Sequence, residues 1–177
     1  MKKIILTAII ATGLFACKNN AVETQSGTQA SMPKNAAGYI IDSSANINTA
    51  KSLVETFVNG DLAASKAKLL ALYADTAKVH DNKNTQKFAD NIDTYAQIRK
   101  AGAKFTVIDE PIVWETVLNK PSPNGVTSYV HAYYNFSVEK GGKKDTYTMN
   151  VVWDFVGDKV VAEWDLYDSA PITAVLK

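Results

Sequence analysis

The spacing of apolar residues predicts helices in the first half of the folded part of the chain. Leu53, Val54, Phe57 and Val58 recur at helical intervals and form one apolar stripe. Asparagine or aspartate precedes each apolar segment, as is typical of helix N-caps. The predicted helices are residues 49–58, capped by Asn46 or Asn48; residues 62–73, capped by Asp61; and residues 92–99, started by Asp90 or Asn91 and stopped by Gly102.

After Gly102 the apolar period changes from that of a helix to that of a strand. Glycine-containing turns at 139–143 and 156–159 predict antiparallel hairpins. An earlier strand is predicted within 72–82, where a helix end leads into a strand that finishes at His80 and Asp81. Helices followed by an antiparallel meander predict an α+β domain with the helices on one sheet face. The other predicted strands are residues 105–109, 112–118, 128–138, 146–156 and 159–167.

Alternation along the predicted strands indicates which side chains lie under the helices. In each of the last three strands one face is mainly apolar and the other is more polar. We therefore expect Asp168, which shares the face of Trp164, to point inward, and Glu163 and Asp165 to point outward. The other residues expected to face inward are Val130, Ala132, Tyr134, Phe136, Tyr147, Met149, Val151, Trp153, Phe155, Val160, Ala162 and Leu166.

The first residues predict export and lipid anchoring. Lys2 and Lys3 precede an apolar stretch that ends in Leu14-Phe15-Ala16-Cys17, which resembles the signal of bacterial lipoproteins, where the cysteine is lipidated and becomes the new N-terminus. We expect residues 1–16 to be the signal peptide, 17–38 to be the lipidated Cys17 and a flexible tether, and 39–177 to be the domain. The expected location is the bacterial cell envelope, on the periplasmic or outer-membrane face. The alternative is an ordinary signal peptide with an incidental cysteine.

Composition argues against several classes of partner. Nineteen Lys and Arg against 18 Asp and Glu give a net charge of +1, with no basic cluster in the predicted domain, so nucleic-acid binding is not expected. Two histidines and a single cysteine make a zinc site unexpected, and no Walker or dinucleotide pattern predicts a cofactor. Because Cys17 has no second cysteine to pair with, the core alone must hold the fold together.

Three short motifs carry a resemblance to a known superfamily. They are Asn59-Gly60-Asp61-Leu62, Ala71-Leu72-Tyr73-Ala74-Asp75 and Val79-His80-Asp81. With the stretch 157–165 and the order of elements, they resemble the nuclear transport factor 2-like superfamily, which includes SnoaL-like polyketide cyclases and ketosteroid isomerases. The resemblance covers residues 47–168 and implies a cone of strongly curved, mainly antiparallel sheet closed by three N-terminal helices around a pocket. It also implies a homodimer through the outer sheet face, as in many members.

The resemblance transfers only part of the isomerase site. Asp81 lies where ketosteroid isomerases keep their proton-abstracting aspartate, and His80 where many SnoaL-like proteins place a histidine. The isomerases' oxyanion tyrosine and protonated aspartate correspond to Leu53 and Val151. Because one oxyanion donor lowers a barrier by about 3 kcal/mol, steroid isomerisation is not expected. SnoaL-like cyclisation is less excluded, since it asks for a carboxylate or histidine base beside a large apolar pocket.

The candidate catalytic residues are therefore Asp81 or His80 as general base, with Asp168 assisting. Adjacent strand residues point to opposite faces, so only one of His80 and Asp81 should point into the pocket. In the competing interpretation, Asp81 caps the turn that follows, His80 is half-exposed and Asp168 belongs to a strand-end turn. His131 is expected on the outer face, as a surface or interface residue.

Aromatic residues make up most of the predicted pocket. A cone lined by Tyr and Trp with one or two carboxylates suits a flat, apolar ligand. Our main hypothesis is that the domain is a non-catalytic module that binds a small, largely apolar molecule. The alternatives are a SnoaL-like isomerase or cyclase, and a domain that dimerises or docks an envelope protein through its outer face. The predicted pocket residues are Tyr73, Tyr95, Trp114, Tyr134, Met149, Trp153 and Trp164.

Overall fold

The computed structural model describes residues 37–177 of the chain. The predicted signal peptide, the lipidation at Cys17 and almost all of the predicted tether lie outside these residues and stay predictions. Among the described residues, no helix is both long enough and apolar enough to span a membrane.

Three helices form where the apolar spacing predicts them. Helix α1 (Ala45–Asn59) begins earlier than expected, because Ser44 and not an asparagine is its N-cap; the Ser44 hydroxyl accepts a hydrogen bond from the backbone N–H of Ile47 at 3.0 Å. Helix α2 (Leu62–Leu72) has the predicted cap, since Asp61 accepts from the N–H of Ala64 at 3.0 Å. Such a cap contributes about 1 kcal/mol. Helix α3 (Phe88–Lys100) begins two residues before Asp90.

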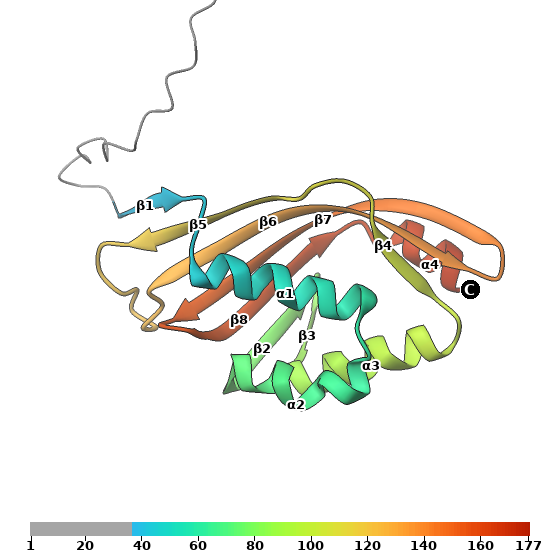
Figure 1. The fold of residues 1–177 in the computed structure, drawn as a ribbon, viewed down its shortest axis with the longest axis horizontal. Coiled ribbons are helices and arrows are strands. Elements are labelled where there is room, and N and C mark those ends of the chain that lie inside the picture. Colours follow the sequence, from blue (N-terminus) through green and yellow to red (C-terminus); the bar gives the residue numbers. More distant parts are fainter. Residues whose placement is uncertain (1–36) are drawn as a thin grey trace, which may run out of the picture. The chain divides into compact units, whose positions relative to one another are not determined.

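The strands of the described residues form one sheet in the order β1-β5-β6-β7-β8-β2-β3, with β4 also paired to β6 (Figure 1). Neighbouring strands are antiparallel except β2 and β8, which run parallel. The strands are β1 (Gly38–Ile41), β2 (Tyr73–Asp81), β3 (Asn84–Lys87), β4 (Lys104–Val107), β5 (Ile112–Leu118), β6 (Ser128–Lys140), β7 (Lys143–Val156) and β8 (Lys159–Tyr167).

Sequence periodicity missed three short elements. Strands β1 and β3 have four residues each, which is too short for a clear alternation, and all four residues of β3 are polar. Strand β3 follows a tight turn in which Asn82 adopts a φ of 49°, a conformation that asparagine tolerates better than most residues. The third element is helix α4 (Ala170–Leu176), which begins with Pro171 in its first turn.

The expected α+β class is confirmed: α1, α2 and α3 pack on one face of a mostly antiparallel sheet (Figure 1). The alternation predicted for β6 and β7 is also confirmed. Their inward residues are buried against the helices, with Trp153 only 1 % exposed and Phe155 fully buried.

The alternation predicted for β8 is wrong after its third residue, because the strand contains a β-bulge. Phe155 pairs with Val160, but Asp154 pairs with Ala162, so Val161 has no partner on β7. One extra residue moves every later side chain to the opposite face. Trp164 and Leu166 are consequently 41 % and 52 % exposed on the outer face, while Glu163 and Asp165 are buried on the inner face.

Candidate functional site

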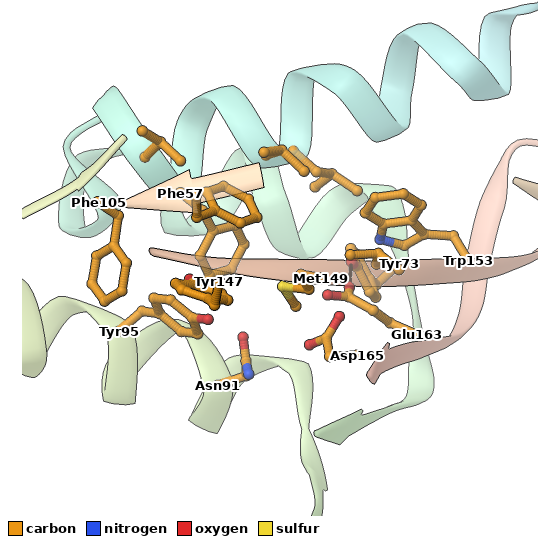
Figure 2. Close-up of a pocket in the computed structure, with 15 residues that line it drawn as sticks. Phe57, Tyr73, Asn91, Tyr95, Phe105, Tyr147, Met149, Trp153, Glu163 and Asp165 are labelled. Carbon is orange, nitrogen blue, oxygen red and sulfur yellow. Dashed lines mark hydrogen bonds between the residues drawn. The ribbon is translucent and has the colours of Figure 1, made fainter. Parts of the chain in front are cut away.

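A small cavity lies between the helices and the inner face of the sheet (Figure 2). It encloses about 50 Å³ and is mainly apolar, with its charged groups on β8. Its lining residues are Leu53, Val54, Phe57 and Val58 from α1, Asn91 and Tyr95 from α3, and Tyr73, Phe105, Phe136, Tyr147, Met149, Val151, Trp153, Glu163 and Asp165 from the sheet.

One end of the cavity is aromatic. The ring of Phe57 meets that of Tyr95 edge to face, with 5.2 Å between ring centroids, and Tyr95 lies 5.8 Å from Phe105. Phe136 and Tyr147 are stacked at 5.4 Å and complete this end. Phe57 and Tyr95 are only partly buried, so solvent reaches this end more readily than it reaches β8.

The other end is acidic, and we refer to Glu163 and Asp165 as the acid pair. The two residues are 8 % and 3 % exposed, and they share the inner face because they are two positions apart on β8. The Tyr73 hydroxyl donates a short hydrogen bond to Oε2 of Glu163 (Figure 2). The ring of Tyr73 is itself fixed by stacking on Phe88, with 3.4 Å between centroids.

Burial strengthens proton binding by both members of the acid pair. It raises the pKa of Asp165 well above its ordinary value, and the negative charges of Glu163 and Asp81 raise it further. Burial also raises the pKa of Glu163, but hydrogen bonding from Tyr73 works in the opposite direction. We therefore place the ionised carboxylate on Glu163, which has a hydroxyl donor, and the retained proton on Asp165.

Three buried polar atoms on the cavity lining have no hydrogen-bond partner within residues 37–177. They are Nδ2 of Asn91, Nε1 of Trp153 and Oδ1 of Asp165. The indole N–H of Trp153 lies near enough to Glu163 to lower the pKa of that carboxyl, yet it makes no hydrogen bond of good geometry. A buried polar group without a partner costs about 1–3 kcal/mol, so three around one cavity suggest a site shaped for something other than core packing.

The structure separates His80 from Asp81, as their alternation requires. Asp81 pairs in register with Asp165 on the inner face, but it does not line the cavity. Burial raises the pKa of Tyr167, and a hydrogen bond with Asp81 raises it further. His80 points to the outer face, where its ring stacks on Trp164 at 3.9 Å and its Nδ1 lies 3.0 Å from the Thr85 hydroxyl. Only Asp81 of the two therefore lies on the inner face, and neither residue lines the cavity.

Several other predicted site residues lie away from the cavity. Asp168 is exposed and accepts a hydrogen bond from the N–H of Ala170 at 2.9 Å, which makes it a strand-end turn residue beside α4. Trp114 lies on the outer face, stacked on His131, and Trp164 was moved there by the bulge. Tyr134 is buried in the core but does not line the cavity, and its burial raises its pKa to about 12. The predicted lining residues Tyr73, Tyr95, Met149 and Trp153 do surround it.

Sequence reasoning missed Asn91, Glu163 and Asp165 as cavity residues. Glu163 and Asp165 belong to the stretch that carried the superfamily resemblance, but strict alternation assigned them to the outer face. Glu163 and Asp165 alternate with Trp164 and Leu166 along the strand. The sequence itself therefore does not indicate which of these two pairs of side chains is buried. Asn91 was considered only as a possible start of helix α3.

Comparison with known proteins supports the fold. No protein-family model and no curated protein matches the chain. Solved structures do: a nuclear transport factor 2-like protein of unknown function from Burkholderia pseudomallei is 18% identical with a TM-score of 0.54, covering 76% of this chain and 99% of its own. A candidate polyketide cyclase from Pseudomonas putida is 10% identical with a TM-score of 0.54, covering 76% and 100%. TerC, co-crystallised with polyporic acid, is 14% identical with a TM-score of 0.53, covering 75% and 98%. The chain thus has the nuclear transport factor 2-like fold that its motifs imply.

Proposed function

We propose that this protein is a lipid-anchored envelope protein whose domain binds a small, largely apolar molecule, with the polar group of the ligand at the acid pair. The observation that supports this most is the set of unpartnered buried atoms on Asn91, Trp153 and Asp165 around one apolar cavity. A ligand that donates a hydrogen bond to Oδ1 of Asp165 would satisfy a buried acceptor that has no partner within residues 37–177.

The cavity volume narrows the ligand. At roughly 10–15 Å³ for each water, about 50 Å³ is room for about three to five waters. Drug-sized sites measure about 300–1,000 Å³, so a steroid-like or polycyclic ligand does not fit without a large rearrangement. We therefore propose a ligand with only a handful of non-hydrogen atoms, in place of the flat, extended ligand that the aromatic composition suggested.

A thermal-shift screen of small alcohols, ketones and amines tests this proposal. A compound at ten times its dissociation constant stabilises the folded domain by about 1.4 kcal/mol, which corresponds to a rise in Tm of roughly 4–6 °C. Val54→Phe should abolish that rise, because Val54 lines the cavity and a phenyl ring would fill it. Val156→Phe is the matched control, since Val156 is exposed at the end of β7 and does not line the cavity. A screen without any stabilising compound would contradict the proposal.

The lipid anchor has its own test. The N-terminal peptide of the mature protein, isolated from bacterial membranes, should begin at Cys17 and carry acyl chains, which its mass reveals directly. Cys17→Ala should yield no acylated peptide. A mature N-terminus elsewhere in the chain, with Cys17 removed or unmodified, would show that the leader is an ordinary signal peptide.

A second candidate function, acid–base catalysis, is favoured by the register of three inner-face positions. Asp165 pairs with Val151 on one side and with Asp81 on the other. The carboxyl that the isomerases keep at the position of Val151 is thus supplied here from the adjacent strand. Asp165, whose pKa burial raises, beside the carboxyl of Asp81 would combine a proton donor with a base. Asp81→Asn should then abolish turnover of small carbonyl substrates, whereas the exposed Asp158→Asn should not change it.

The outer face supports a homodimer. One register row crosses five strands as Trp114, His131, Val152, Trp164 and His80. Its rings are stacked in pairs, with 5.1 Å between the ring centroids of Trp114 and His131 and 3.9 Å between those of Trp164 and His80. A row of aromatic side chains on an uncovered sheet face suits a two-fold interface. Sedimentation should give twice the monomer mass for the wild-type domain and the monomer mass for Trp164→Glu; a monomeric wild type at high micromolar concentration would exclude this interface.

A further inference from the structure

We infer that the ligand group that binds at the acid pair is positively charged, and that the ligand is a small alkylammonium ion. This inference rests on the proposed binding function and names its ligand class. It follows from the charge balance of the cavity, from the hydrogen-bonding capacity of its acidic end and from the aromatic rings at its other end.

The charge balance of the cavity is negative. Glu163 and Asp165 line it and Asp81 is next to them in register, yet none of the described lining residues is a lysine, arginine or histidine. Arg99, on the helix that supplies Asn91 and Tyr95, instead donates to the backbone oxygens of Phe57 and Gly60 at 3.1 and 2.6 Å. Buried carboxylates in proteins are normally paired with a cation. An ammonium ion is the partner that this pair lacks.

The neutral groups beside Glu163 favour the ionised form of that carboxyl. The Tyr73 hydroxyl donates to Glu163, and the indole N–H of Trp153 lies beside the same carboxyl without a hydrogen bond of good geometry. Neither group supplies a positive charge. Oδ1 of Asp165 remains an acceptor with no donor in the described part of the chain. An N–H of an ammonium group can bind there, and the side-chain oxygen of Asn91, which points toward the cavity in Figure 2, can accept from a second N–H.

The aromatic end suits the alkyl part of such an ion. Phe57, Tyr95 and Tyr147 present rings to the cavity, and Met149 lies between them and the acid pair (Figure 2). Methyl groups attached to a cationic nitrogen carry part of its charge and are attracted to ring faces. The limited volume restricts the alkyl part to a few carbons, so amino acids and polyamines are too large or too polar.

Proton release is a specific consequence of this arrangement. Before a ligand binds, Asp165 holds a proton more readily than an ordinary aspartate, because burial and its acidic neighbours raise its pKa. A bound cation stabilises the carboxylate form, so Asp165 gives its proton to the buffer as the ammonium enters. A neutral ligand leaves that proton in place. Calorimetry in two buffers with different ionisation enthalpies measures the number of protons released.

The experiment compares tert-butylammonium with tert-butanol on the whole mature domain at pH 7. The two compounds have the same number of non-hydrogen atoms and nearly the same shape, and they differ in an ammonium or a hydroxyl group. Charge-assisted hydrogen bonds exceed neutral ones by about 1–1.5 kcal/mol, which is about tenfold in affinity. We expect tert-butylammonium to bind at least about tenfold more tightly than tert-butanol, with release of a proton.

Two substitutions locate the effect. Asp165→Asn should remove the preference for the ammonium and the proton release while leaving the weaker binding of tert-butanol. Asp158→Asn, in the exposed β7–β8 turn, is the matched control and should change neither. Because the ligand pair is also compared on the wild-type domain, the inference can be tested even if Asp165→Asn does not fold.

The outcomes separate the inference from the function on which it rests. Equal or tighter binding of tert-butanol, or ammonium binding without proton release, would overturn the inference while the proposed binding function stands. Failure of both compounds and of the wider screen to bind would overturn both. Ammonium preference that persists unchanged in Asp165→Asn would place the cation elsewhere and also overturn the inference.

Discussion

The two faces of strand β8 differ more than any other two regions of the molecule, although their residues alternate along one segment. Glu163 and Asp165 lie buried among apolar residues on the inner face, whereas Trp164 and Leu166 are largely exposed on the outer face. Strict alternation along the sequence would place Trp164 and Leu166 on the inner face and Glu163 and Asp165 on the outer face. The difference shows that one unpaired residue, Val161, decides whether this domain has an acidic cavity or a continuous apolar core.

Deleting Val161 should have the largest effect, because it should change which side chains of β8 face the helices. The deletion would restore strict alternation and turn Trp164 and Leu166 inward, into space too small for them. Overpacking costs about 1–3 kcal/mol for each large side chain, so we expect a loss of roughly 3 kcal/mol or more in the free energy of unfolding, measured with urea. Val161→Ala, which keeps the bulge, should cost only about 1 kcal/mol. Equal effects of the two changes would show that the bulge does not control the faces.

Tyr73→Phe should have the next largest effect, because it removes the hydroxyl that donates to the buried Glu163. A hydrogen bond to a charged group contributes about 1.5–3 kcal/mol, and we expect a loss of that size in urea unfolding at pH 7. The matched control is Tyr129→Phe on the outer face, where the ring is only half-buried and a change within about 0.5 kcal/mol is expected. Similar losses at both positions would mean that the hydrogen bond from Tyr73 to Glu163 contributes no more to the free energy of unfolding than an ordinary surface hydroxyl does.

The pH dependence of stability should distinguish the inner carboxyls from ordinary surface ones. Because burial raises the pKa of Asp165 in the folded state, the folded chain binds more protons than the unfolded chain at any pH above the ordinary aspartate value of 3.8 and below the raised one. Stability contributed by this group is therefore fully present below pH 3.8 and is lost as the pH rises, with a slope of at most about 1.4 kcal/mol per pH unit for one proton.

Asp165→Asn should flatten that slope, which urea titrations at several pH values between 4 and 8 would measure. The exposed Asp158→Asn serves as the control and should leave the slope of the wild type unchanged. A wild-type stability that increases over this range in step with the variant would contradict proton retention by Asp165.

The smallest expected effect concerns the outer face. His80 and Trp164 stack with 3.9 Å between ring centroids, in nearly parallel planes. Aromatic pairs of this kind contribute about 0.5–1.5 kcal/mol beyond buried area, and exposure places this pair at the lower end. A double-mutant cycle of His80→Ala and Trp164→Ala should give a coupling of about 0.5 kcal/mol. Zero coupling would show that the row is held by the sheet register alone.

The sequence predicted those features that repeat along the chain. Helix α2 was predicted with its Asp61 cap, and the alternation of β6 and β7 correctly placed Trp153 and Met149 on the inner face. Each of these depends on local spacing, which a single sequence displays. The fold class followed from the same patterns together with the motifs around Tyr73 and Asp81.

The site could not be predicted because it depends on a β-bulge that leaves no recognisable pattern in the local sequence. The bulge at Val161 lies where β8 pairs with two strands, and the register between β2 and β8 also shifts there, between Tyr73 and Lys78. Val-Val-Ala is compatible with a regular strand, so periodicity gave no warning. Asp168 was assigned inward by the same alternation, and the fold instead uses it to begin helix α4.

The parallel pairing of β2 with β8 also determines when the site comes into existence. Tyr73 and Glu163 are separated by 90 positions in the chain, and the strand that carries Glu163 is the last strand to leave the ribosome. Such distant pairing forms late because a long loop must close first. A chain interrupted before residue 159 would leave the edges of β7 and β2 open and would contain neither carboxyl of the acid pair. The cavity with its acid pair therefore forms only after β8 has been synthesised and has paired with its neighbouring strands.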